Sequence, residues 1–590
     1  MTHRTKESTG DFPADSAKGF HFHNRPEAIP FTFWASGSMQ PSFYPCSYRS
    51  GLSLTSPKRS ARFDMATPDE LNDVANDLNL AQLRRFLYLG DECHCFPRSV
   101  SYPFSPERSQ LIKELENAEL VSEALKEITE AFKNGHYLGI ETLIYALAAL
   151  GHSQKEITKS EALRSASKIC TSASMMLTFA HIYKDISKPN KGWGRAHRKF
   201  LIRWYNGKDA KDLAAEVTKV KSCHKWTHKD VLCMAHVKAE QAGTAAILKY
   251  LVKGLEVAEK DHGSESDAVP ILNYLKGVYE VSHSSDPETV ARLIEAHDLC
   301  LQHIPSKLLK TKEVSLCIIP RIPIQNLLEL LPQFNKAGLL KPNSPHYKAV
   351  LERLGSEEAL ENTMIGPLES FLAIRKWQIS NKILPGKPMV RQSTPALDDA
   401  LQNLHLASFK NVKATEKRYL VALDINLTMN HSKCASGSAL TPSHVSDIAL
   451  LALLKAEISN VTTIVFSGGE VLPVEINHKM NLGDVIEHLN EITAGPVFLS
   501  APLNWALTKK MRFDTFVLFT DRLSSTQDDD LANVFKEYKE TMHLPNARYI
   551  LSTLCDQTSS FPHEDPSFLN IVGFNTKLLQ IIQDFSCAVF

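Results

Sequence analysis

A long succession of helical patterns, separated by helix-breaking residues, most constrains the fold of this 590-residue chain. Across residues 71–382, apolar residues recur three and four positions apart, as in the row formed by Leu120, Ala124, Ile128 and Phe132. This spacing is typical of helices that bury one face. Further helices are predicted over 141–150, 161–173, 195–205, 213–220, 244–257, 289–303 and 325–331.

Breakers separate the predicted helices, and the connections between them are short. Many successive short helices favour a helical-repeat solenoid. A compact helical bundle is the alternative, because no motif recurs at a fixed period. The breakers are Gly151, Pro189, Gly207, Pro287, Pro320, Pro323 and Pro332.

The pattern changes after a Pro- and Gly-rich linker at residues 382–394. Strands and helices then alternate, which predicts a parallel α/β sheet. The chain is therefore expected to be mainly α, with a helical-repeat domain at 65–395 and an α/β domain, including its leading helical segment, at 396–590. The predicted strands are 419–424, 462–466, 515–521 and 547–551, and the predicted helices are 445–458, 482–492, 501–510, 528–542 and 576–585.

The first 64 residues differ from the rest. They are rich in Ser, Pro, Phe and His and show neither helical nor strand periodicity. We expect a disordered extension there, and a second interpretation makes Met65 an alternative start. The 11 cysteines are odd in number and widely spread, which is typical of a protein in a reducing compartment.

The net charge is zero, with 66 Lys and Arg against 66 Asp and Glu, but the charge is unevenly distributed. Residues 184–238 hold 14 basic and 5 acidic residues, a net charge of +9, whereas residues 416–590 hold 13 and 20, a net charge of −7. The net charge of zero therefore excludes a uniformly basic chain, but it does not exclude a basic patch. Such a patch can bind an anionic partner such as nucleic acid.

One predicted helix concentrates this charge. At 100° per residue, four of its cations fall within about 140° of arc, opposite three apolar residues. The apolar face can dock into the helical stack while the basic face contacts phosphates, although a merely solvated face has the same pattern. The cations are Arg195, Arg198, Lys199 and Arg203, and the apolar residues are Phe200, Leu201 and Trp204.

Aromatic residues are interleaved with these charges. Trp193, Trp204, Tyr205 and Trp226 lie in the basic window. Aromatic rings between cations can stack on bases. At helical spacing, however, most of them are predicted to belong to the core.

The first predicted strand of the α/β domain ends in a polar motif. Asp424, Asn426 and Thr428 resemble a degenerate DxSxS motif of von Willebrand factor A domains, in which a carboxylate and two hydroxyls bind a divalent cation. Asp521 matches a later aspartate of that site, but Val497 stands where a threonine is expected. Oxygen ligands suit Mg²⁺, so a degenerate magnesium site is one interpretation. In the other, Asp424 and Asp521 cap the strand ends.

From about residue 78 to the C-terminus, the order and spacing of several motifs resemble the TROVE-domain family of Ro ribonucleoproteins. The resemblance implies a ring-like array of HEAT-type repeats closed by a von Willebrand A-like domain. The motifs are QLRRFL (82–87), WGRAHRK (193–199), WYN (204–206), VTK (217–219), WTHKD (226–230), LIEAH (293–297), KEV (312–314), KRYLVALD (417–424) and GFNT (573–576).

The resemblance also implies RNA binding. Family members bind small noncoding Y RNAs on the outer surface of the ring and take single-stranded 3′ ends of misfolded noncoding RNAs, which suggests RNA quality control. Lys219 and His236 match basic positions that the family uses for RNA, whereas Cys223 stands where the family has an arginine. Neighbouring cations can compensate for that loss. The expected RNA-binding residues are Lys219, His236, Arg195, Arg198, Lys199, Arg203, Lys221 and Lys225.

The sequence therefore predicts a noncatalytic RNA-binding protein, because no nucleophile–base motif or phosphate-cradling loop is evident. We expect it in the cytoplasm, with access to the nucleus, with protein partners on the A-like domain and no membrane partner. A protein-interaction scaffold without specific RNA binding is the leading alternative, and metal-dependent hydrolysis is the least favoured one.

Overall fold

The computed structural model describes the chain from residue 68 onward in eight stretches. The predicted extension at 1–64 and the predicted linker at 382–394 lie outside them, as do the side chains of residues 68–76. The described stretches are 68–90, 110–187, 193–362, 364–381, 395–434, 439–527, 530–557 and 565–590.

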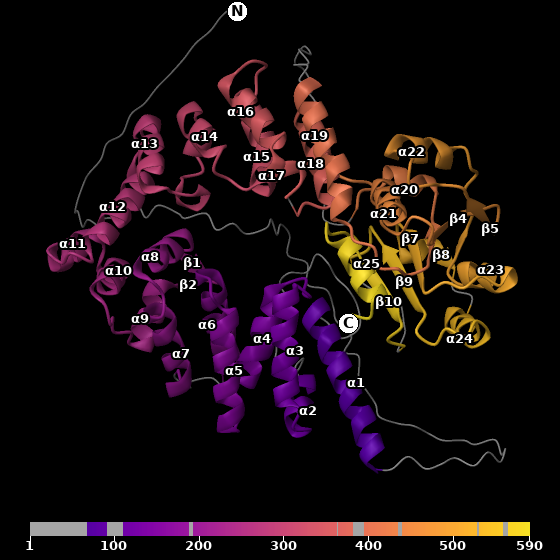
Figure 1. The fold of residues 1–590 in the computed structure, drawn as a ribbon, viewed down its shortest axis with the longest axis horizontal. Helices are drawn as coiled ribbons and strands as arrows, with labels where there is room; N and C mark the ends of the chain where they lie inside the picture. Colours follow the sequence, from indigo (N-terminus) through magenta and orange to yellow (C-terminus); the bar gives the residue numbers. More distant parts are fainter. Residues whose placement is uncertain are drawn as a thin grey trace, which may run out of the picture. The chain divides into compact units, whose positions relative to one another are not determined.

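Short helices in two layers form the first part of the described chain (Figure 1). Helices α3, α5, α7 and α9 contact one another in succession, while α4 and α6 pack behind them. This arrangement agrees with the solenoid interpretation. The elements are α1 (Pro68–Leu89), α2 (Gln110–Asn117), α3 (Val121–Asn134), α4 (Ile140–Leu150), α5 (Glu156–Ile169), α6 (Ala173–Ile186), α7 (Arg195–Asn206), α8 (Ala210–Lys219), β1 (Ser222–Cys223), β2 (Trp226–Thr227) and α9 (His228–Ala235).

The helical array continues through α8, which contacts α10 and α12, and then through the pairs α12–α13, α13–α14, α14–α16 and α16–α19. Helix α18 then packs on α21 (Pro442–Glu457) of the α/β domain. The elements are α10 (Ala242–Lys253), α11 (Leu255–His262), α12 (Val269–His283), α13 (Pro287–His297), η2 (Leu301–His303), η3 (Leu308–Lys310), α14 (Lys312–Ile318), α15 (Ile324–Lys336), α16 (Pro345–Leu354), α17 (Glu357–Leu360), α18 (Pro367–Asn381), α19 (Pro395–Ser408) and η4 (Phe409–Asn411).

Several helix boundaries differ from the sequence prediction. Gly254, with φ +93°, separates α10 from α11, where a single helix over 244–257 was expected. Helix α13 ends at His297 because Asp298 is left-handed with φ 49°, and residues 301–303 form a separate turn. Helix α15 runs through Pro332, which was predicted to break it, because the buried apolar face continues on both sides of the proline.

The α/β domain contains a six-stranded sheet in the order β10-β9-β7-β3-β4-β5. The four predicted strands, which correspond to β3, β4, β7 and β9, pair in parallel as expected. Of the two further strands, β10 pairs in parallel with β9, and the edge strand β5 pairs antiparallel with β4. The elements are β3 (Tyr419–Leu423), α20 (Leu427–His431), α21 (Pro442–Glu457), β4 (Val461–Ser467), β5 (Glu470–Val474), α22 (Leu482–Asn490), β6 (Val497–Phe498), α23 (Ala501–Lys509), β7 (Thr515–Thr520), η5 (Leu523–Ser525), β8 (Thr526–Gln527), α24 (Leu531–Thr541), β9 (Arg548–Thr553), β10 (Phe568–Val572) and α25 (Leu578–Ser586).

The antiparallel edge follows from a glycine pair. Gly468 and Gly469 have φ values of 58° and 93° and are the only two residues between β4 and β5. A two-residue hairpin loop with both φ values positive favours glycine at both positions. This dipeptide is the sequence signal from which β5 could have been predicted.

The first described helix contacts the last strand and the last helix. Arg85, which is 8% exposed, donates hydrogen bonds to the carbonyls of Pro566 and Phe568, each at 2.9 Å. The Tyr88 hydroxyl donates to Asp584 Oδ2 at 2.5 Å, and its ring stacks on Phe590 with 4.1 Å between ring centroids. The helical array and the α/β domain therefore form a closed circuit of contacts.

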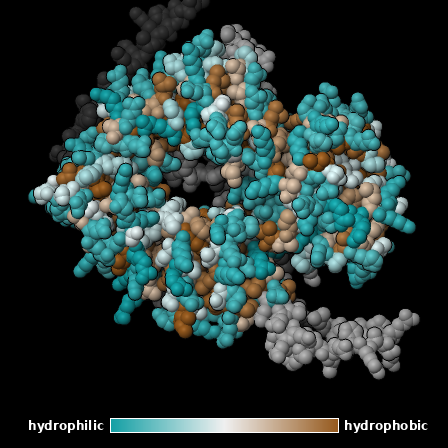
Figure 2. Space-filling view, viewed as in Figure 1, coloured by the Kyte–Doolittle hydropathy of each residue, from teal (hydrophilic) through white to brown (hydrophobic). Residues whose placement is uncertain are grey.

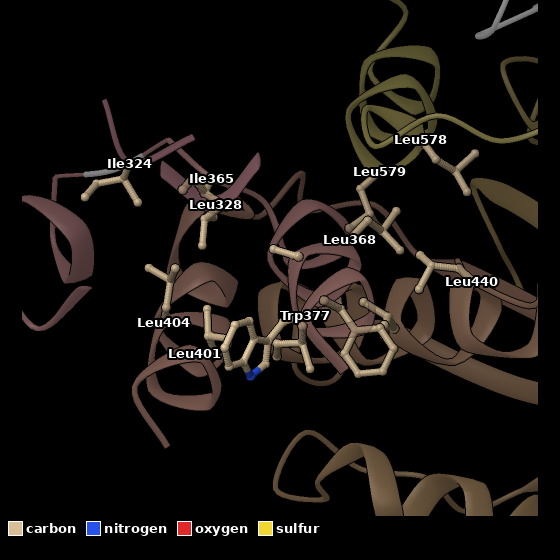
Figure 3. Packing of buried hydrophobic residues seen from close by; sticks show 14 of the residues in the cluster. Ile324, Leu328, Ile365, Leu368, Trp377, Leu401, Leu404, Leu440, Leu578 and Leu579 are labelled. Carbon is tan, nitrogen blue, oxygen red and sulfur yellow. The ribbon is translucent and has the colours of Figure 1, made fainter. Parts of the chain in front are cut away.

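A single apolar core spans the junction between the helical array and the sheet. It runs from Leu328 of α15 through Trp377 of α18 and Leu401 of α19 to Leu578 of α25 (Figure 3). The Trp377 ring is fully buried, and its indole N–H donates to Asp398 Oδ1 at 2.7 Å. Full burial of each apolar side chain of this kind stabilises the fold by about 1.5–3 kcal/mol. The shared core therefore holds the helical array and the α/β domain together.

Hydrophilic residues cover most of the face shown in Figure 2, with scattered apolar residues between them. Single exposed apolar side chains are normal on a folded protein. Among the described helices, each is too short or too polar to cross a lipid bilayer.

Candidate nucleic-acid interface

Helix α7 buries its apolar face and presents its cations to solvent, as its sequence pattern predicts. Phe200 and Leu201 are 4% and 0% exposed, whereas Arg195, Lys199 and Arg203 are exposed and Arg198 is half-buried. The Trp204 indole N–H donates to the Cys170 carbonyl at 2.9 Å and so fixes α7 against the end of α5. The predicted orientation of this helix is confirmed.

A cleft of about 380 Å³ lies between α5 and α7, and it contains a cation that the sequence analysis did not include. Its charged lining residues are Arg164, Lys199, Arg203 and Glu161. None of the three cations forms an ion pair within the described stretches. A groove with three cations that lack ion pairs and one carboxylate suits a phosphate better than a cation. Only the fold brings Arg164 of α5 next to the cations of α7, because Arg164 lies more than 30 positions earlier in the chain.

The second group of predicted cations surrounds the end of α8 and the β1–β2 hairpin. Lys219 is the last residue of α8, and Lys221 directly precedes β1; both are exposed. The hairpin turn consists of His224 and Lys225, with φ values of 49° and 65°. His236, also exposed, ends α9 in a left-handed conformation with φ 54°. Hairpin turns of this type favour Asn or Gly, so the turn places two basic side chains at a conformational cost.

A buried histidine joins the two groups of cations. His228 Nε2 lies 2.9 Å from the Val220 carbonyl, which can only accept, so Nε2 carries the proton and Nδ1 accepts from the Tyr205 hydroxyl at 2.8 Å. Burial lowers the pKa of His228 to about 4, so the ring is neutral at pH 7. In addition, Asn206 Nδ2 donates to the Lys238 carbonyl at 2.9 Å. The end of α7 is thus fixed to the start of α9 and to the segment that follows α9.

Cys223, in the position where the resemblance leads one to expect arginine, lies in β1 and is half-buried. Its sulfur lies 3.5 Å from the Thr178 hydroxyl. Burial raises the pKa of the Cys223 thiol, but hydrogen bonds with His224 and Thr178 outweigh burial and leave the pKa below the ordinary value. A thiol cannot supply the forked contacts of a guanidinium, so Lys221 and Lys225 are the nearest cations in sequence that can contact phosphate.

Three of the four aromatic residues considered for base stacking belong to the core. Trp193, Trp204 and Tyr205 are 5%, 6% and 0% exposed. Trp226 is half-buried and stacks on Trp193 with 5.4 Å between ring centroids. The expectation that most of these rings form core is confirmed, and base stacking is not a role for the three buried rings.

The predicted metal-site residues are only partly brought together. Asp424 and Asp521 are 3% and 2% exposed at the ends of β3 and β7, whereas Thr428 is exposed on α20. The Asn426 side chain turns its N–H₂ group toward Asp424 Oδ1, at 2.7 Å. The Val497 side chain, fully buried in β6, offers no oxygen. A hydrogen-bond donor and an apolar side chain therefore stand where a hard cation needs oxygen ligands, and this donor set does not fit Mg²⁺.

The fold and surface define a class of protein: a closed helical-repeat array joined to a von Willebrand A-type domain. The chain matches the TROVE domain model over residues 75–438 and the Ro60 vWA domain model over residues 418–586. The chain therefore belongs to the TROVE-domain family.

Two relatives and one solved structure illustrate this membership. The chain is 22% identical to the RNA-binding protein RO60 of Caenorhabditis elegans over 573 residues, which cover 85% of this chain and 87% of the relative. It is 25% identical to the protein of the same name from Deinococcus radiodurans over 396 residues, which cover 67% and 72%. The crystal structure of the Deinococcus radiodurans RO (RSR) protein superposes with a TM-score of 0.76 at 22% identity, covering 87% of this chain and 100% of that one, and shows the shared fold.

Proposed function

We propose that this protein binds RNA, specifically small noncoding Y RNAs and misfolded noncoding RNAs, and acts without catalysis in RNA quality control. The observation that carries the proposal is the set of outward-facing cations on α5 and α7. Arg164, Lys199 and Arg203 line one cleft and form no ion pair within the described stretches. Family membership and the names of the two relatives support RNA as the anion.

Phosphate contacts supply the affinity in this proposal. Each cation that contacts a phosphate releases condensed counterions, so binding weakens steeply as salt increases. Because the deep major groove of an RNA helix excludes side chains, structured RNA is recognised mainly by backbone shape and by its 2′-hydroxyls. Exposed cations distributed over α5, α7 and the β1–β2 hairpin suit that mode, whereas the buried tryptophans do not suit stacking on single-stranded bases.

The A-type domain has a different role in the proposal. Its net charge of −7 over residues 416–590 repels phosphate, so RNA binds the helical array and protein partners bind the A-type domain. The protein acts in the cytoplasm and has access to the nucleus.

The experiment is sequencing of RNA crosslinked to the native protein in cells, compared with a variant in which Arg164, Lys199 and Arg203 are changed to Gln. We expect enrichment of a few small noncoding RNAs, which the variant loses. A control matched in charge changes Lys336, Lys341 and Lys348, exposed residues in and between α15 and α16, to Gln and should retain the RNAs. Recovery of background ribosomal fragments alone from the unaltered protein would contradict the proposal and favour the protein-interaction scaffold.

A further inference from the structure

A side-chain amide occupies the edge of the sheet where an A domain of the metal-binding kind uses oxygen ligands. Asn426 follows β3 and precedes α20, and its Nδ2 lies 2.7 Å from Asp424 Oδ1 and 3.3 Å from the Gly495 carbonyl oxygen. Both neighbours are acceptors, so the nitrogen, not the oxygen, of the amide faces them. The amide therefore bridges the end of β3 to the loop that precedes β6.

Both carboxylate oxygens of Asp424 accept hydrogen bonds from within the protein. Its Oδ1 accepts from the backbone N–H and the amide of Asn426, at 2.9 and 2.7 Å. Its Oδ2 accepts from the Thr520 hydroxyl at 2.8 Å. A buried carboxylate with three internal donors is stabilised by them, and a cation would have to displace at least the amide.

The loop that supplies the second acceptor is held independently of Asn426. The Gly495 N–H donates to the Phe466 carbonyl at 3.0 Å, and a Cβ at Gly495 would lie 2.6 Å from the backbone nitrogen of Gly468. Only glycine allows this close approach to the β4–β5 hairpin. The Gly495 carbonyl oxygen is therefore held at a position that the Asn426 amide can reach.

We propose that the Asn426 amide replaces the divalent cation of this edge as an internal bridge between β3 and the loop at Gly495. The folded A-type domain then needs no divalent metal, and its partners dock without a metal-bound carboxylate. The Asn426 amide does not reach Asp521 Oδ1. This buried oxygen lacks a hydrogen-bond partner in the described part of the chain. The inference is independent of RNA binding.

The first test measures thermal unfolding of the full-length, RNA-free protein. Samples are dialysed against EDTA and titrated with Mg²⁺ or Mn²⁺ at constant ionic strength. We expect no saturable rise in Tm, because an ion that does not bind the native state cannot stabilise it. A saturable rise that disappears when Asp424 is changed to Asn would overturn the proposal.

The second test introduces hydroxyl oxygens at the two positions where the metal-binding A domains have them. In Asn426→Ser/Val497→Thr, the amide is removed and two hydroxyls are introduced. We expect Tm in EDTA to fall by roughly 2–6 °C in Asn426→Ser alone, as the bridge is lost. We also expect Mn²⁺, followed as the loss of the free-ion EPR signal, to bind the double variant and not the unaltered protein.

The control is Asn430→Ser on the exposed side of α20, which should change neither Tm nor Mn²⁺ binding. If Asn426→Ser alone keeps the unaltered Tm, the amide is not a bridge and the proposal is wrong. If the double variant is too unstable to purify, the metal titration of the unaltered protein still decides the question of metal dependence.

Discussion

The Tyr205 hydroxyl donates a 2.8 Å hydrogen bond to Nδ1 of His228, joining the end of α7 to the start of α9 inside the core. Both residues are almost completely buried, at 0% and 1% exposure. The bond fixes the distance between the cations of α7 and those around the β1–β2 hairpin. A rigid spacing between two charged groups is what recognition of a structured RNA by shape requires.

Removing this bond should destabilise the fold. In Tyr205→Phe, the Nδ1 of His228 loses its donor and remains buried, which costs about 1–3 kcal/mol. Urea denaturation at pH 7 measures the loss. Tyr347→Phe is the control, since the hydroxyl of that buried residue forms no hydrogen bond in the described stretches. Equal losses in the two variants would show that the bond contributes little.

Stability should fall as the pH decreases below about 6.5. Burial lowers the pKa of His228 to about 4 and that of His197 to about 3, from an ordinary value of 6.5. The unfolded chain therefore binds more protons than the folded chain between these values, and acid favours unfolding. The stabilisation is fully present above pH 6.5 and is lost as the pH falls through 4 and then 3.

Buried acids such as Asp447 work in the opposite direction. Burial raises the pKa of Asp447 to about 7, so the folded chain keeps this proton longer and Asp447 favours folding as the pH falls from 7 to about 4. Burial also lowers the pKa of His303, His405 and His444 to about 4, so five histidines against this aspartate leave a net loss of stability. Urea unfolding at pH 7 and pH 5 measures it, and His228→Gln should reduce the difference. A protein more stable at pH 5 than at pH 7 would contradict the prediction.

The pair Lys219 and His236 should contribute to RNA affinity. Changing both to alanine should weaken binding of a small structured RNA by roughly 1–3 kcal/mol and reduce the dependence of affinity on salt. Filter binding over a range of KCl concentrations measures both quantities. If affinity and salt dependence stay the same, these two positions do not contact RNA in this protein.

The α5–α7 cleft should act in the same way. Arg164→Gln/Arg203→Gln should weaken RNA binding to a similar extent and lower the salt slope by about two. The Lys336→Gln/Lys348→Gln variant has the same change in charge on α15 and α16 and is the matched control. A loss of affinity in the control as large as that in the cleft variant would indicate a general charge effect.

Lys225 should show a trade between stability and binding. It lies at φ 65° in the β1–β2 turn, a conformation that costs a non-glycine residue about 1 kcal/mol. Lys225→Gly should therefore stabilise the protein by up to that amount and weaken RNA binding. Thermal unfolding and filter binding measure the two effects, and a weaker fold in the glycine variant would show that the Lys225 side chain is needed for packing.

Much of the fold follows from local pattern. The apolar face of α7 and the four predicted strands could be read from residue spacing, because a buried face requires that spacing in any tertiary context. The continuation through Pro332 could not, since it depends on what packs against the helix. The break at Gly254 has a local signal in the glycine itself, which the sequence prediction did not use. The β5 strand was missed although Gly468 and Gly469 mark its hairpin.

The candidate site was predictable only in part. Arg195, Lys199 and Arg203 were evident from one helix, but Arg164 reaches the same cleft from α5 and has no sequence signal that links it to them. The direction of the Asn426 amide depends on the Gly495 carbonyl, which a loop 69 positions away supplies. Long-range partners of this kind are set by the fold and not by local sequence.

The contacts of Arg85 and Tyr88 with the last strand and helix have a consequence for unfolding. An open array of helical repeats frays from its two termini, where each outermost repeat lacks one neighbour. Here the first described helix contacts β10 and α25, so the described part of the array has no terminal repeat without a neighbour. Unfolding must then begin where two packed elements separate inside the closed array. Separating the helical array from the A-type domain would leave both ends of the array without a packing partner.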